Sequence, residues 1–129
     1  MTKKQQPRGL SWKDEPDEHD FPAAADYLSL LLSDPGPTVD ELRRSQTVQR
    51  KPKDLLRASR LPLLLPSDPE VSRDLRKVAK GEPLSPVLLV RGHAPAGRAL
   101  IVADGYHRIC AAYHLDEDGV VPCRLVDLP

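Results

Sequence analysis

The 129-residue sequence predicts an α+β fold, in which a small mixed sheet with packed helices follows an extra N-terminal helical segment. Short, nearly continuous apolar runs predict buried strands, and they occupy residues 86–90, 100–103 and 120–126. Apolar residues at helical spacing predict the helices, in residues 21–32, 71–78 and 109–115. The 14 prolines favour many short elements over long helices. We therefore expect one compact domain with short strands.

The first part of the chain has the composition of a tail. Residues 1–20 are polar and charged, and Pro7 and Pro16 interrupt them. We expect these residues to be mobile, with Trp12 as a docking point for the tail.

Residues 21–46 form the expected N-terminal helical extension. Its first helix begins at Phe21 and is stopped by the proline- and glycine-rich stretch 34–37. Thr38 and Glu41 have the spacing of a capping box, so they predict the start of a second, short helix. Packing on the sheet, closure over a site and a dimer contact are the roles open to this extension, and packing is the simplest.

Residues 47–129 form the expected core. After a short extended piece, a helical turn is predicted over 54–60, followed by an apolar loop or strand over 61–66. Asp68 and Pro69 then start a helix that Gly81 ends. The predicted strands and the last helix follow in the order strand, strand, helix, strand.

Charge and cysteine content limit the function classes. The chain has 19 basic and 19 acidic residues and therefore no net charge, so we expect weak binding to DNA. A local basic stripe is open as an alternative to a solvated surface, and it would consist of Arg43, Arg44, Arg50, Lys51, Lys53, Arg57 and Arg60. Cys110 and Cys123 are expected to be reduced thiols in the core. Without a long apolar run or a signal-peptide pattern, we expect a cytoplasmic protein that does not insert into a membrane.

The most informative stretch is the turn from Asp104 to Arg108, between a predicted strand and a predicted helix. The first turn of a helix favours acidic side chains, because its free N–H groups carry partial positive charge. This turn instead has His107 and Arg108 after Gly105. A bound anion would explain that choice, and a phosphate suits a glycine turn followed by a guanidinium. The alternative is an ordinary Asp104 cap with a solvated basic first turn.

Residues 53–128 resemble the ParB/sulfiredoxin superfamily. Three of its parts are recognisable in order: an Asp-Gly-x-His-Arg turn at 104–108, the helix that follows it, and a final strand with a hydrophobic-Pro start at 121–126. The upstream segments 63–69 and 86–90 are similar to the loop, helix start and central strand of that family. The resemblance implies a ParB/sulfiredoxin-like core.

The form of the turn is closest to the nucleotide-binding branches, which include sulfiredoxins and ADP-dependent free serine kinases. The resemblance implies that Gly105, Tyr106, His107 and Arg108 bind the phosphates of ATP, ADP or CTP, and that Asp104 and His107 are catalytic. Asp104 would accept a proton or help to hold Mg²⁺. No set of residues with metal-ligand spacing is assigned.

Two departures from the family limit the activity. Sulfiredoxins need a cysteine directly before the His-Arg pair, and this chain has Tyr106 there, which excludes sulfinic acid reduction. The serine kinases also need a second acidic residue from the N-terminal half, for which only Asp68 and Glu70 are candidates.

Three functions stay open at this point. The first is phosphoryl transfer or nucleotide hydrolysis. The second is a non-catalytic nucleotide sensor that contacts a protein partner, or a second copy, through the N-terminal helices. The third is a ParB-like nucleic-acid-binding protein or nuclease, which zero net charge disfavours.

Overall fold

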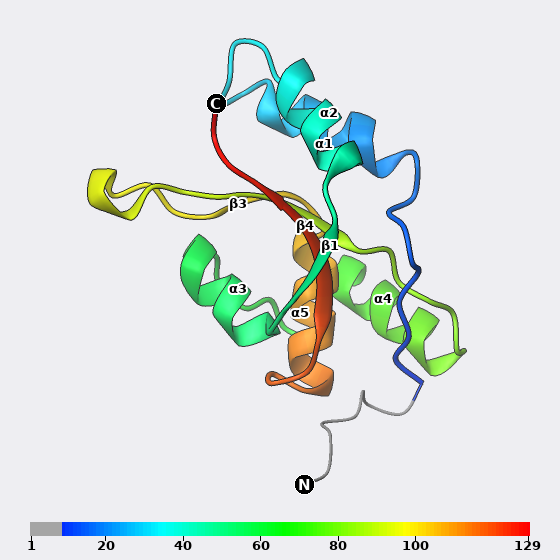
Figure 1. Ribbon diagram of the computed structural model, residues 1–129. Coiled ribbons are helices and arrows are strands. Elements are labelled where there is room, and N and C mark those ends of the chain that lie inside the picture. Colours follow the sequence, from blue (N-terminus) through cyan, green and yellow to red (C-terminus); the bar gives the residue numbers. More distant parts are fainter. Residues whose placement is uncertain (1–8) are drawn as a thin grey trace, which may run out of the picture.

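The computed structural model describes residues 9–129 and has a four-stranded mixed sheet at its centre (Figure 1). The strands are β1 (Thr47–Arg50), β2 (Val87–Val90), β3 (Ile101–Asp104) and β4 (Val121–Val126). Their order across the sheet is β1-β4-β2-β3. β4 is parallel to β2, and the other two neighbouring pairs are antiparallel. The predicted α+β class with a small mixed sheet is confirmed.

Helices cover both faces of the sheet. The helices are α1 (Asp20–Leu28), α2 (Gly36–Arg44), α3 (Pro52–Ser59), α4 (Pro69–Ala79) and α5 (Tyr106–Leu115), with a 3₁₀ turn η1 (Ala94–Ala96) between β2 and β3. Val87 and Leu89 of β2 pack with α3, α4 and α5, whereas Leu88 and Val90 pack with α1 and α2. Alternate residues of a strand point to opposite faces, so β2 is buried on both sides, as its unbroken apolar run predicts.

Two helix boundaries differ from the prediction. The first helix ends at Leu28, and Leu30 and Leu31 beyond it are exposed, so the helical spacing continues past the helix itself. The second helix begins at Gly36, with Pro35 at its N-cap and no side-chain cap, which makes the predicted capping box at Thr38 wrong. Proline at the start of a helix has no N–H that needs a partner, and this favours the earlier start.

The cap of α4 and the positions of the cysteines agree with the sequence. Asp68 accepts hydrogen bonds from the N–H groups of Glu70 and Val71, both at 3.1 Å. Cys110 and Cys123 are free and buried, and burial raises the pKa of the Cys123 thiol to about 12. Both cysteines are therefore core residues rather than reactive thiols.

The segment before α1 packs on the core, in contrast to the mobile tail that its composition predicts. Leu10 is buried, and Trp12 forms a parallel β-bridge with Leu84, which supports its role as a docking point. In Figure 1 this dark-blue segment runs along one side of the molecule from α4 to α1. The local sequence is polar, but two apolar side chains and the backbone bridge anchor it. The part of the predicted tail in residues 1–8 lies outside the described residues.

Arg124 of β4 is a buried cation that ties the N-terminal layers to the sheet. It is 4% exposed and forms an ion pair with Glu15. One of its amino groups donates to the carbonyls of Leu42 and Arg43, at 3.2 and 3.0 Å. These carbonyls belong to the last turn of α2, where the helix dipole favours a cation. Within residues 9–129 no helix combines the length and apolar character needed to cross a bilayer.

The burial of α1 generates a test of whether the helical extension folds with the core. Leu28 is fully buried against the sheet, whereas Leu30 is 79% exposed. We expect Leu28→Ala to lower the free energy of unfolding by about 2–5 kcal/mol, because it leaves a cavity, and Leu30→Ala to change it by less than about 0.5 kcal/mol. Urea denaturation followed by circular dichroism measures both. A small effect of Leu28→Ala would mean that α1 is not part of the cooperative unit.

Candidate functional site

The predicted strand, turn and helix are present at residues 101–115. β3 ends at Asp104, Gly105 is the N-cap of α5, and Tyr106 begins the helix. Gly105 has a φ of 110°, and a Cβ at this position would lie 2.5 Å from Cγ1 of Val87. Both the left-handed backbone and the close approach to β2 require glycine here. The turn is therefore fixed by the packing of the sheet beneath it.

A polar cavity of about 310 Å³ lies at the N-terminus of α5, and we call it the α5 pocket. Its walls come from the segment before α1, from α4, from residues 83–85 and from the glycine turn. The charged and histidine side chains that line it are Lys13, Asp17, His19, Asp20, Glu70, Arg73, Asp74, Lys77, Asp104, His107 and Arg108. The first turn of α5, which has no side-chain cap and no acidic residue, faces this mixed set of charges.

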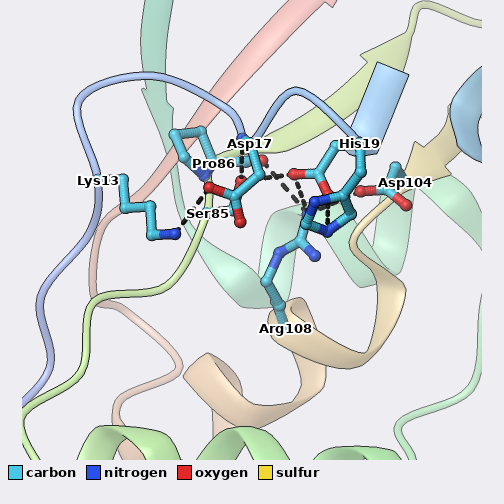
Figure 2. Close-up of polar contacts among 8 residues, drawn as sticks. Lys13, Asp17, His19, Ser85, Pro86, Asp104 and Arg108 are labelled. Carbon is cyan, nitrogen blue, oxygen red and sulfur yellow. Dashed lines mark hydrogen bonds and ion pairs between the residues drawn. The ribbon is translucent and has the colours of Figure 1, made fainter. Parts of the chain in front are cut away.

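Arg108 has protein carboxylates as partners, so it is neither the solvated basic group of the ordinary-cap interpretation nor a guanidinium left free for a phosphate. Its guanidinium donates to Asp104 at 2.9 Å and lies 3.7 Å from a carboxylate oxygen of Asp20 (Figure 2). The same nitrogen donates to the carbonyl of Pro86 at 3.3 Å. Arg108 is thus held inside the protein by an ion-pair network, and its Nε is buried without a hydrogen-bond partner among the described residues.

Asp20 connects this network to the N-terminal segment. Asp20 is 3% exposed, and its carboxylate accepts a hydrogen bond of 2.5 Å from the Ser85 hydroxyl. Ser85 in turn accepts from the backbone N–H of Asp17 at 3.0 Å, and Lys13 donates to the Asp17 carboxylate at 2.7 Å (Figure 2). The Lys13 hydrogen bond lowers the pKa of Asp17. The segment before α1 therefore supplies acidic groups to the same pocket as the glycine turn.

Two further carboxylates line the pocket, the half-buried Asp104 and the buried Asp74. Burial raises the pKa of Asp104, and the neighbouring Arg108 opposes part of that shift. Burial also raises the pKa of Asp74 in α4, which is 6% exposed, and the nearby cations Arg108, Lys77 and Arg73 oppose part of that shift. A buried carboxylate that lines a cavity is suited to bind a cation or a proton donor.

The structure brings together some of the predicted site residues. Gly105, His107, Arg108 and Asp104 line the α5 pocket. The Tyr106 side chain does not line it, because its hydroxyl donates to the carbonyl of Pro62 in the loop before α4. The predicted phosphate contact of the Tyr106 side chain is therefore not formed in this arrangement.

Neither of the two sequence candidates for a second acidic residue, Asp68 and Glu70, is a free carboxylate in the pocket. Asp68 is used as the cap of α4 and does not line the pocket. Glu70 lines it but forms an ion pair with Arg73 on the same helix. The acidic groups that lie closest to Arg108 come instead from Asp20 and Asp104.

Asp17, His19 and Asp20 form a group of ligand atoms that the sequence analysis did not assign to a metal. One atom from each side chain lies within 4.8 Å of the others, a separation suited to a single cation. His19 is exposed, and its ring also lies 3.4 Å from Asp20. The close spacing of these three residues along the chain was the available signal, but it lay in a segment expected to be mobile.

Comparisons of the chain with protein-family models, with curated proteins and with solved structures found no match. Membership of the ParB/sulfiredoxin superfamily stays a prediction from the turn motif and the order of elements.

Two carboxylates of the pocket, Asp74 and Asp17, generate pH-dependent predictions of opposite sign. The pKa of Asp74 is raised above 3.8 in the fold, so the native state loses stability as the pH rises above that value. We expect Asp74→Asn to be more stable than the wild type at about pH 7, with the gain shrinking toward about pH 4. The pKa of Asp17 is lowered, so Asp17→Asn should lose about 1 kcal/mol or less at about pH 7, and this loss should fade in acid.

Urea denaturation of both variants in metal-free buffer, at several pH values, gives the comparison. If Asp74→Asn were less stable than the wild type at about pH 7, attraction to the neighbouring cations would outweigh the cost of burying the Asp74 carboxylate, and the expected sign would be wrong.

Proposed function

We propose that the α5 pocket binds the phosphate groups of a nucleotide together with a divalent cation. The observation that carries this proposal is the uncapped N-terminus of α5, whose free N–H groups face a polar cavity. Basic side chains from a second element, Arg73 and Lys77 of α4, lie on the same cavity. A phosphate bound there would contact backbone donors and cations from two sides.

The carboxylates of the pocket make a cation necessary for this binding mode. Asp20, Asp74 and Asp104 lie beside the proposed phosphate site and are all largely buried, so they would repel an unaccompanied phosphate strongly. A divalent cation placed between the carboxylates and the phosphate turns that repulsion into attraction. The donor set of Asp17, His19 and Asp20 fits such an ion: the carboxylate oxygens suit Mg²⁺, and the imidazole also suits Mn²⁺ or Zn²⁺.

Individual residues have distinct roles in the proposal. The N–H groups of Tyr106, His107 and Arg108 would hold phosphate oxygens, and Gly105 allows the phosphate to approach the backbone. Asp104 is the candidate base for phosphoryl transfer or hydrolysis. Burial raises the pKa of Asp104 and so makes its carboxylate a better proton acceptor.

A nucleotide sensor without turnover is the second candidate, and one observation favours it. Asp104 already accepts a hydrogen bond from Arg108 at 2.9 Å. Asp104, the proposed base, and Arg108, which would stabilise the transition state, are therefore paired with each other. Turnover would require the pair to open on ligand binding, whereas binding alone would not.

The proposal is tested by titrating ADP, ATP, CTP and pyrophosphate into the protein, each with and without Mg²⁺, Mn²⁺ or Zn²⁺. We expect cation-dependent binding that Lys77→Gln weakens roughly fivefold, equivalent to about 1 kcal/mol for an exposed charged contact. Asp17→Asn should remove most of the cation dependence. Calorimetry measures affinity, and release of inorganic phosphate distinguishes turnover from sensing.

Matched controls are available on the same segments. Lys80 lies near the end of α4 and Asp14 lies before α1, and both are exposed and outside the pocket. Lys80→Gln and Asp14→Asn should bind as the wild type does. The proposal is rejected if no phosphate compound binds with any of the cations, or if the control variants lose as much affinity as the pocket variants.

A further inference from the structure

A second cavity, of about 590 Å³, lies on the side of the sheet that carries α3, and we call it the arginine pocket. Its walls are α3, the connection between β2 and β3, and residues at the C-terminal ends of β2 and β4. Figure 1 shows this connection, in yellow, extending beyond the sheet next to α3. The α5 pocket lies at the opposite end of β2, beside Ser85. The two sites share no lining residue.

The cavity is built on a fixed frame. The N–H of Leu100 donates to the carbonyl of Ala58 at 3.0 Å, which joins the start of β3 to α3. At Gly92 a Cβ would lie 2.4 Å from the carbonyl oxygens of Arg98 and Ala99, so the two arms of the connection touch through their backbones. The volume lies within the range of small-molecule sites.

The floor of the arginine pocket is apolar. It consists of Leu55, Ala58, Leu89, Leu100 and Leu125. None of the described residues that line it is aromatic. This floor suits an aliphatic group and offers no ring on which a nucleic-acid base would stack.

The rim has a strong excess of positive charge. Arg50, Arg57, Arg60, Arg91 and Arg98 line the cavity, with Asp54 as its single carboxylate. Asp54 pairs with Arg57, and Arg91 pairs with Asp127 outside the cavity. Arg50 and Arg60 donate only to backbone carbonyls, and Arg98 has no side-chain partner among residues 9–129. Three guanidiniums thus face the cavity without a carboxylate, and a bound anion would relieve their mutual repulsion.

Arg60 adds an independent observation from the backbone. It is the only residue other than glycine with a positive φ in the described part of the chain, at 60°. It follows the last residue of α3, a position at which glycine avoids the steric cost of the left-handed conformation. The Arg60 side chain lines the cavity and donates to the carbonyl of Gly97 at 3.2 Å. Non-glycine residues in this conformation are found preferentially at functional sites, which makes the Arg60 side chain a candidate for ligand contact.

We propose that the arginine pocket binds a small amphipathic anion, with its aliphatic group on the leucine floor and its carboxylate or phosphate between Arg60 and Arg98. Binding requires both parts, because the floor supplies apolar contact and the rim supplies charge-assisted hydrogen bonds. This site is independent of the proposed nucleotide site.

Calorimetric titration with four probes tests the proposal: octanoate, octyl phosphate, octanol and inorganic phosphate, all below micelle-forming concentrations. We expect octanoate or octyl phosphate to bind at least about tenfold more tightly than octanol or phosphate alone. The two amphipathic probes distinguish a carboxylate ligand from a phosphate ligand.

Variants identify the site. Arg60→Gly and Arg98→Gln should each weaken the amphipathic probes about tenfold, the loss of one charge-assisted contact. Arg60→Gly should also raise the melting temperature, since glycine accepts the left-handed backbone, so lost binding would not reflect unfolding. Arg44→Gln removes an exposed charge outside the cavity and should bind normally, as should Lys77→Gln in the α5 pocket.

The proposal is overturned if neither amphipathic probe binds better than its separate parts, or if Arg60→Gly and Arg98→Gln bind as Arg44→Gln does. A short single-stranded oligonucleotide and an acidic peptide are included as competitors. Tighter binding of either one, lost in the same two variants, would replace the small-anion assignment with a macromolecular interface.

Discussion

The buried carboxylate of Asp20 is the constraint on which the arrangement of the α5 pocket depends. A charge with 3% exposure must have partners, because leaving it unpaired costs several kcal/mol. Its partners are the Ser85 hydroxyl before β2 and the Arg108 guanidinium in α5. Satisfying this one group therefore holds the start of α1, the entrance to β2 and the first turn of α5 within a few ångströms of one another.

The same constraint changes the meaning of the glycine turn. An arginine at a helix N-terminus is easily interpreted as a phosphate ligand, but here Arg108 first balances Asp20 and Asp104. A phosphate that enters this pocket would compete with those carboxylates for the guanidinium. The competition explains why the proposed binding mode includes a cation and why the backbone N–H groups, together with the exposed cations of α4, are the better phosphate donors.

Local signals were sufficient for much of the fold. The unbroken apolar run of β2, the Asp68 cap and the glycine before α5 each depend on a few neighbouring residues, and the structure contains all three. The segment before α1 was missed because its anchors are distant: Glu15 and its partner Arg124 are 109 positions apart. No local pattern distinguishes a polar segment held by such pairs from a free one.

The arginine pocket shows a second case in which local sequence gives only part of the arrangement. Sequence proximity grouped the cations between Arg43 and Lys53 with Arg57 and Arg60 into one stripe. In the structure Arg43 pairs with Glu18 and Lys53 with Asp118. Arg50, Arg57 and Arg60 of the stripe do line one cavity, together with Arg91 and Arg98 from a different segment. A cavity formed by two segments that are far apart in the chain has no signature in either one alone.

The position of β4 in the sheet has a consequence for the order of folding. β4 lies between β1 and β2 but follows both of them in the chain. β1 therefore gains its pairing partner only when β4, at the far end of the chain, reaches it, as in the pairing of Thr47 with Arg124. Closing such long loops is slow, and until it happens the apolar edge of β2 lacks a neighbour on that side. The β2–β3 hairpin and α5 can assemble earlier, because they are adjacent in the chain. We expect the glycine turn to be formed in the nascent hairpin and helix, and the N-terminal layers to dock only when the central strand is inserted.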